Sequence, residues 1–182
     1  MKKTITIVAG MLCLTLITEA QSASSTQTLN LTLVNAISIV FTGSGTSTGS
    51  AVSLPFTTIS NYSNGVTSSA QQLMVQSNKG FTVTVNANAT NFTYTGSTSP
   101  SPTMPVNGVL KLEVTANGTG GAIASPFSSS SYASLTSAAQ NLLINCSNGG
   151  NQTFSIQYQA NPGFSYPSGN YSTSVIYTAT QL

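Results

Sequence analysis

The 182-residue sequence contains no His, no Trp, no Asp and no Arg, and only 3% of its residues are charged. An ordinary globular domain carries about a quarter charged residues. A Ser-His-Asp triad cannot form without His or Asp. Side-chain metal sites also lack ligands, which leaves only a weak Ca²⁺ site made of backbone carbonyls and Asn. These absences predict that the protein is not an enzyme and has neither a cofactor nor a resident metal ion.

The N-terminal segment has the layout of a secretory signal peptide. Lys2 and Lys3 precede an apolar run over residues 5–17, and small residues follow at Thr18 and Ala20. We therefore predict a signal peptide over residues 1–20 and a protein that is secreted to the cell surface or the extracellular space. The run is shorter than the ~20 apolar residues of a membrane span, and no later segment is longer. The mature chain is thus expected to have no integral membrane span.

The remaining residues, 21–182, carry very little charge. Their charged side chains are Lys79, Lys111 and Glu113. Nucleic-acid binding requires clustered Lys and Arg, which are missing, so nucleic acid is not an expected partner. A glycosidase of the usual kind requires two carboxyl groups, and this region has one.

Cysteine is also scarce, because Cys146 is the single cysteine of residues 21–182. It cannot form a disulfide within the mature chain. Free cysteines are among the most buried residue types, and Cys146 follows Leu142 and Ile144 at strand spacing. We expect a thiol packed in the core, with pairing between two chains as the alternative.

Alternating apolar and polar residues dominate residues 21–182. This period-two pattern, rich in Thr, Val, Ile and Tyr and bounded by Gly, Asn, Ser and Pro, predicts half-buried antiparallel strands. Only residues 134–142 are compatible with a short helical turn. We therefore predict an all-β protein, either a sandwich or a barrel. Three long loops are expected, at residues 43–50, 96–105 and 117–131.

An internal repeat is present in the sequence. Residues 66–75 (VTSSAQQLMV) match residues 135–144 (LTSAAQNLLI), and the likeness continues on both sides with small gaps. The units cover about residues 34–105 and 106–182. Units of this size bury little surface alone. We therefore expect one sandwich domain over residues 21–182, built from two repeated halves with a leading strand from Thr28, rather than two small domains.

Lys111 and Glu113 lie two residues apart in the segment LKLEV, so both charges fall on one face of the predicted strand. They either protect an edge strand against pairing with other chains or contribute to an intramolecular Lys–Asn isopeptide bond. The second role needs a buried triad, whereas these residues lie on the more polar face. We therefore favour the first.

Several runs resemble those of bacterial secreted β-sandwich proteins of the fimbrial-subunit and spore-coat-U kind. They are YSNG at 62–65, LMV at 73–75, SNKGFTVTV at 77–85 and YPSGNYSTSVIYTAT at 166–180. The last run is also similar to the C-terminal strand of WxL-type wall-binding domains. The resemblance implies an immunoglobulin-like antiparallel sandwich in a surface or appendage protein. The chain departs from both groups, since one cysteine cannot supply the pilin disulfide and a Trp-x-Leu motif is absent.

Two functions from different classes follow. The first is a structural or adhesive surface subunit that self-associates by strand exchange, as pilins do, with Leu29, Leu31 and Leu33 as the exchanged apolar side chains. Deletion of residues 21–34 distinguishes a donated strand from the first strand of a self-complete sandwich. The alternative is a carbohydrate- or cell-wall-binding module, with Tyr62 and Tyr132 as candidate aromatic contacts to glycans. Repeat-related tyrosines are also common at structural corners, where the hydroxyl forms a hydrogen bond.

Overall fold

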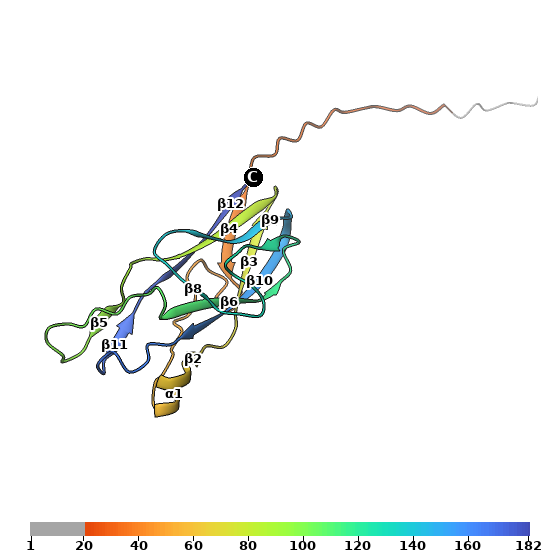
Figure 1. Ribbon diagram of the computed structural model, residues 1–182. Helices are drawn as coiled ribbons and strands as arrows, with labels where there is room; N and C mark the ends of the chain where they lie inside the picture. Colours follow the sequence, from red (N-terminus) through yellow and green to blue (C-terminus); the bar gives the residue numbers. More distant parts are fainter. Residues whose placement is uncertain (1–20) are drawn as a thin grey trace, which may run out of the picture. The chain divides into compact units, whose positions relative to one another are not determined.

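The computed structural model describes residues 21–182, so the predicted signal peptide over residues 1–20 lies outside the described residues. Residues 21–33 are separate from the compact unit formed by residues 34–182. The compact unit contains twelve described strands and one short helix (Figure 1). In chain order these are β1 (Ile37–Phe41), α1 (Ile59–Asn64), β2 (Val66–Thr67), β3 (Gln71–Ser77), β4 (Phe81–Ala87), β5 (Thr93–Thr95), β6 (Leu110–Asn117), β7 (Ala122–Ile123), β8 (Ala133–Ser134), β9 (Gln140–Cys146), β10 (Gly149–Ala160), β11 (Asn170–Ser172) and β12 (Val175–Gln181).

The strands form two larger antiparallel sheets and a small ribbon. The first sheet has the order β1-β3-β10-β6-β8, with β2 pairing to β10, and the second has the order β12-β4-β9-β7. The ribbon is β11-β5. The prediction of an all-β antiparallel sandwich is thus confirmed. Strand β3 pairs with β10 and β4 pairs with β9, so strands from both sequence repeats are present in each sheet. A symmetry between the repeated halves stays a prediction.

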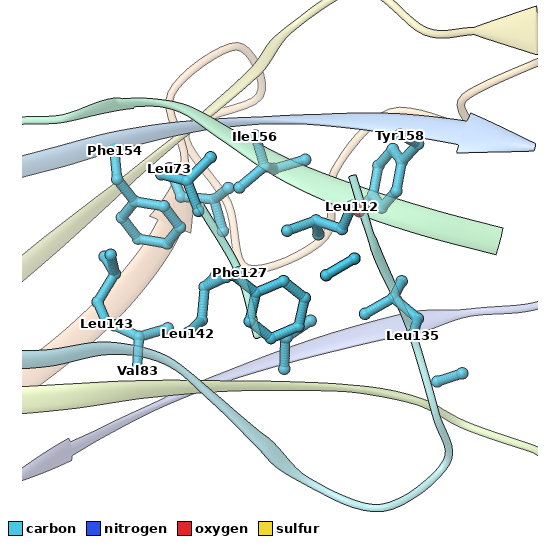
Figure 2. Packing of buried hydrophobic residues seen from close by; sticks show 14 of the residues in the cluster. Leu73, Val83, Leu112, Phe127, Leu135, Leu142, Leu143, Phe154, Ile156 and Tyr158 are labelled. Carbon is cyan, nitrogen blue, oxygen red and sulfur yellow. The ribbon is translucent and has the colours of Figure 1, made fainter. Parts of the chain in front are cut away.

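The core lies between the two sheets. Strand β4 alternates buried and half-buried residues along its whole length, as the sequence pattern predicts. Figure 2 shows side chains of the first sheet, including Leu73, Leu112 and Phe154, facing Val83, Leu142 and Leu143 of the second. Burying a side chain of this size stabilises the folded state by about 1.5–3 kcal/mol. The core therefore fixes which face of each strand turns inward.

Strand β9 departs from simple alternation. Val83 of β4 pairs with Leu143, and Thr84 pairs with Asn141, so Leu142 is an extra residue in β9. This bulge places two consecutive leucines, Leu142 and Leu143, in the core. A second register shift follows before Cys146, where Asn145 has a positive φ of 54°. Asn is one of the few residue types that adopts this conformation readily.

Two sequence-based expectations about local structure are wrong. Residues 134–142 form no helix. Instead, β8 and β9 occupy the ends of this segment, and the apolar residues Ala133, Leu135 and Leu142 are drawn into the core. The helix is at Ile59–Asn64, where Thr58 forms a capping box with Asn61. The expected leading strand over residues 28–34 is also not formed, because these residues have no strand partner within the described chain.

Candidate strand-exchange site

The first part of the candidate site is the segment before β1. Residues 21–33 have neither helix nor strand. Leu29, Leu31 and Leu33 expose 87%, 80% and 80% of their surface. These leucines alternate with Thr and Asn, so an extended backbone would present all three on one side. The segment has the pattern of a strand but lacks a sheet.

The second part is the pair of neighbouring sheet edges formed by β1 and β12. Among the strands of residues 21–182, β1 pairs only with β3 and β12 pairs only with β4. The two edge strands lie next to each other, although they belong to different sheets. Each therefore has backbone N–H and C=O groups on its outer side without a strand partner, and such groups can pair with an added strand. Phe41, at the end of β1, is already bonded to the turn that follows it.

A crevice of about 170 Å³ lies between these edges. Most of the residues that line it have apolar side chains, including Ile39, Phe41 and Leu73 on one side and Val175 and Tyr177 on the other, although polar atoms make up more than half of its accessible surface. The ring of Tyr177 is 6.1 Å from that of Phe41 and 6.4 Å from that of Phe154, measured between centroids. Since Phe154 is a core residue, Tyr177 connects the wall of the crevice to the packed interior of the sandwich.

Two polar contacts join the two sheets near the crevice. In one of them the hydroxyls of Tyr158 and Tyr177 are 2.8 Å apart. Burial raises the pKa of Tyr158 to about 12 and also raises that of Tyr177. In the other, the Gln181 amide donates to the carbonyl oxygen of Ala36 at 2.8 Å. Two more apolar side chains, Ile37 and Ile176, are exposed on the strands that bound the crevice.

The two tyrosines proposed from the sequence have different partners. Tyr62 in α1 lies between Phe56 and Phe164, with ring centroids 5.4 Å from each. Tyr132 instead donates a hydrogen bond to Gln157 Oε1 at 3.0 Å. Burial raises the pKa of Tyr132, while a hydrogen bond with Thr67 lowers it. The structure thus gives Tyr62 an aromatic environment and Tyr132 a polar one.

The residues with the most reactive side chains, Cys146, Lys111 and Glu113, lie in strands of the sandwich. Cys146 is buried and free, and Thr119 Oγ1 lies 3.2 Å from its Sγ. Burial raises the pKa of this thiol, which keeps it protonated. Lys111 and Glu113 pair with Gln159 and Gln157 on the half-buried face of β6, opposite to its core residues. Within residues 21–182 no group of three or more His, Cys, Asp or Glu is placed to bind a metal ion.

Three residues of these surfaces were missed by sequence reasoning. Asn78 and Gln181 contact the start of β1 across 42 and 145 residues of sequence, and a single Asn or Gln gives no signal for such a contact. Phe164 exposes 66% of its surface. Its counterpart in the repeat, where NFTY at 91–94 matches GFSY at 163–166, is the half-buried Phe92, so the repeat gives no signal for this exposure.

No protein-family profile matches the chain, and no curated protein sequence matches it significantly. Among residues 21–182, no helix has the length and apolar character required to cross a membrane.

Proposed function

We propose that the protein is a non-enzymatic surface subunit that self-associates by strand exchange. In this proposal residues 28–34 of one copy lie along the crevice between β1 and β12 of a second copy. Leu29, Leu31 and Leu33 cover the apolar walls, and the backbone pairs with the open strand edges. The observation that carries the proposal is an alternating segment with 80–87% exposed leucines, in a chain that also has a crevice between two open strand edges lined mostly by residues with apolar side chains.

The physical chemistry of the two parts supports their association. Exposed leucine side chains gain roughly 1.5–3 kcal/mol each on full burial. Main-chain hydrogen bonds to a sheet edge provide affinity that does not depend on side-chain charge. This suits a chain whose charged side chains in residues 21–182 are Lys79, Lys111 and Glu113. A secreted surface or appendage location is the setting that we propose for this assembly.

Deletion of residues 21–33 tests the proposal. We expect the shortened chain to keep its urea unfolding midpoint, because these residues belong to no sheet. We also expect it to lose self-association in sedimentation velocity. A triple variant, Leu29→Asn, Leu31→Asn and Leu33→Asn, should behave in the same way. Its control changes Thr28, Asn30 and Thr32 to Ser and should leave self-association intact.

A large loss of unfolding free energy on deletion would instead identify residues 28–34 as the first strand of a self-complete sandwich. Immunogold electron microscopy of the producing cell is an independent test of the subunit proposal. Label on filaments agrees with the subunit proposal. Label lying flat on the envelope without filaments contradicts it.

One observation favours the alternative, a carbohydrate- or cell-wall-binding module. The ring of Phe164 stacks on Tyr62 of α1 with an interplanar angle of 21°, and Phe164 exposes 66% of its surface. An exposed aromatic ring of this kind can stack on a neutral sugar. If this is the function, Phe164→Ala abolishes binding of neutral wall oligosaccharides in calorimetric titrations, whereas Ile59→Ala, an exposed position on the same helix as Tyr62, does not. Tyr132→Phe tests the second proposed tyrosine.

A further inference from the structure

Asn78 holds the residues that connect the N-terminal segment to β1. Its backbone N–H donates to the Ala36 carbonyl at 3.2 Å, and its side-chain oxygen accepts from the Ala36 N–H at 3.0 Å. Its side-chain Nδ2 donates to the carbonyl of Val34 at 2.8 Å. All three contacts lie within the compact unit that starts at Val34.

These bonds prolong the β1–β3 ladder. The last strand pair at this end is Ile37 with Ser77, so Ala36 and Asn78 occupy the next pair position. In an extended strand, the N–H of one residue and the C=O two residues earlier point to the same side. The Asn78 amide meets these two groups at Ala36 and Val34, and so takes the place of a partner strand for residues 34–36.

Gln181 strengthens this arrangement from the second sheet. Its Nε2 lies within hydrogen-bond distance of Ala36 O, Ser77 Oγ and Asn78 Oδ1, at 2.8–3.0 Å. Gln181, the last residue of β12, thereby binds the start of β1 and orients the Asn78 amide. These contacts join β12 to the start of β1, next to the part of the two strands that lines the crevice.

If the N-terminal segment were to bind to its own chain, residues 34–36 could not continue in line with β1. To enter its own crevice, the segment before Val34 must run back alongside β1, so residues 34–36 must form a tight turn. Such a turn would break the bonds of Asn78 to Val34 and Ala36. We infer that Asn78 is a positioning residue that keeps residues 34–36 in line with β1 and thereby directs the N-terminal segment to a second copy. This inference rests on the proposed function.

The selective variant is Asn78→Asp. The new carboxylate still accepts from Ala36 N–H and Gln181, but it cannot donate to the Val34 carbonyl and repels it instead. Asn148→Asp is the matched control, because Asn148 lines the same surface depression as Asn78 and its replacement introduces the same charge. Asn78→Ala is a second variant, which removes all three side-chain bonds, those with Ala36, Val34 and Gln181, and adds no charge.

The experiment has two arms. In the first, a labelled peptide of residues 27–35 is titrated into chains that lack residues 21–33 and either keep Asn78 or carry Asn78→Asp or Asn78→Ala. We expect equal affinity in all of them. In the second, chains of residues 21–182 are studied by sedimentation velocity and hydrogen exchange. The unchanged chain and Asn148→Asp should self-associate. The Asn78 variants should become monomers whose amides at 28–33 exchange slowly, because the segment has folded back.

The two arms separate the failure of the inference from that of the proposed function. If the peptide binds but the Asn78 variants self-associate as the unchanged chain does, the positioning role is wrong and strand exchange stands. The same conclusion holds if the variants are monomers with fast exchange at 28–33. If the peptide does not bind any of the shortened chains, strand exchange fails and the inference fails with it.

Discussion

At the scale of single residues, Gly121 is required by a close contact between backbones. A Cβ at this position would lie 2.5 Å from the Ile144 carbonyl oxygen and 2.8 Å from the Cys146 nitrogen. These are backbone atoms of β9, so they cannot rotate away. We expect Gly121→Ala to lower the free energy of unfolding by about 1–3 kcal/mol, as overpacking does. Urea unfolding measures this. Gly150→Ala, where a Cβ meets nothing within 4 Å, is the control and should stay within about 0.5 kcal/mol of the unchanged chain.

The residue scale also shows what the sequence could predict. The burial of Cys146 was predictable from its residue type, because free cysteines are among the most buried residues. The exposure of Ile144 relative to Leu143 was not, since the bulge in β9 shifts the alternation by one residue. The role of Asn78 could not be predicted from the sequence either. Its role depends on the register of β1 against β3, which is fixed by tertiary packing rather than by neighbouring residues.

At the scale of elements, the contact between β10 and β12 predicts how stability depends on pH. Burial raises the pKa of Tyr158 from 10.0 to about 12 and that of Tyr177 well above 10.0, so the folded state favours the neutral phenols. Below pH 10 both phenols are protonated in the folded and in the unfolded state, and the pair contributes its full stabilisation. Above it the unfolded chain releases protons first, so the free energy of unfolding falls, and the contribution of Tyr158 is lost by about pH 12. For Tyr158 a shift of this size corresponds to about 3 kcal/mol.

Urea unfolding between neutral and alkaline pH tests this dependence. The double variant Tyr158→Phe and Tyr177→Phe should unfold at nearly the same urea concentration as the unchanged chain at pH 7, because both hydrogen-bonding groups are removed together. It should lack most of the alkaline decrease. Tyr158→Phe alone leaves the Tyr177 hydroxyl without its partner and should cost about 1–3 kcal/mol at pH 7. An equally steep alkaline decrease in the double variant would contradict the role of this pair.

Elements differ in how well the sequence predicts them. Strands such as β4 and β6 were predictable, because one face must be apolar and the other polar. Helix α1 was missed because six residues are too few to show a helical period, although Thr58 and Asn61 form its capping box. Residues 28–34 have the same alternation as β4 but no partner strand in the compact unit. Alternation indicates that a segment can pair, and it does not say with which strand or in which copy of the chain.

At the scale of the whole molecule, the scarcity of charge predicts how the proposed self-association responds to salt. Apart from the chain termini, residues 21–182 carry only Lys79, Lys111 and Glu113, and none of these lines the crevice between β1 and β12. The proposed contact consists of leucine side chains, apolar walls and backbone hydrogen bonds, which ionic screening hardly affects. Raising NaCl from about 0.01 M to about 1 M shortens the Debye length from about 30 Å to about 3 Å, yet we expect less than about a twofold change in the dissociation constant.

Sulfate should act differently, because it is excluded from protein surfaces and strengthens apolar burial. Sedimentation velocity in NaCl and in sodium sulfate at equal ionic strength separates the two effects. We expect tighter self-association in sulfate, and the chain lacking residues 21–33 should show no response in either salt. A steep weakening with NaCl would mean that ion pairs hold the copies together. Because so few charged side chains are available, such pairs would have to involve Lys79, Lys111, Glu113 or a terminus, and the contact would lie away from the crevice.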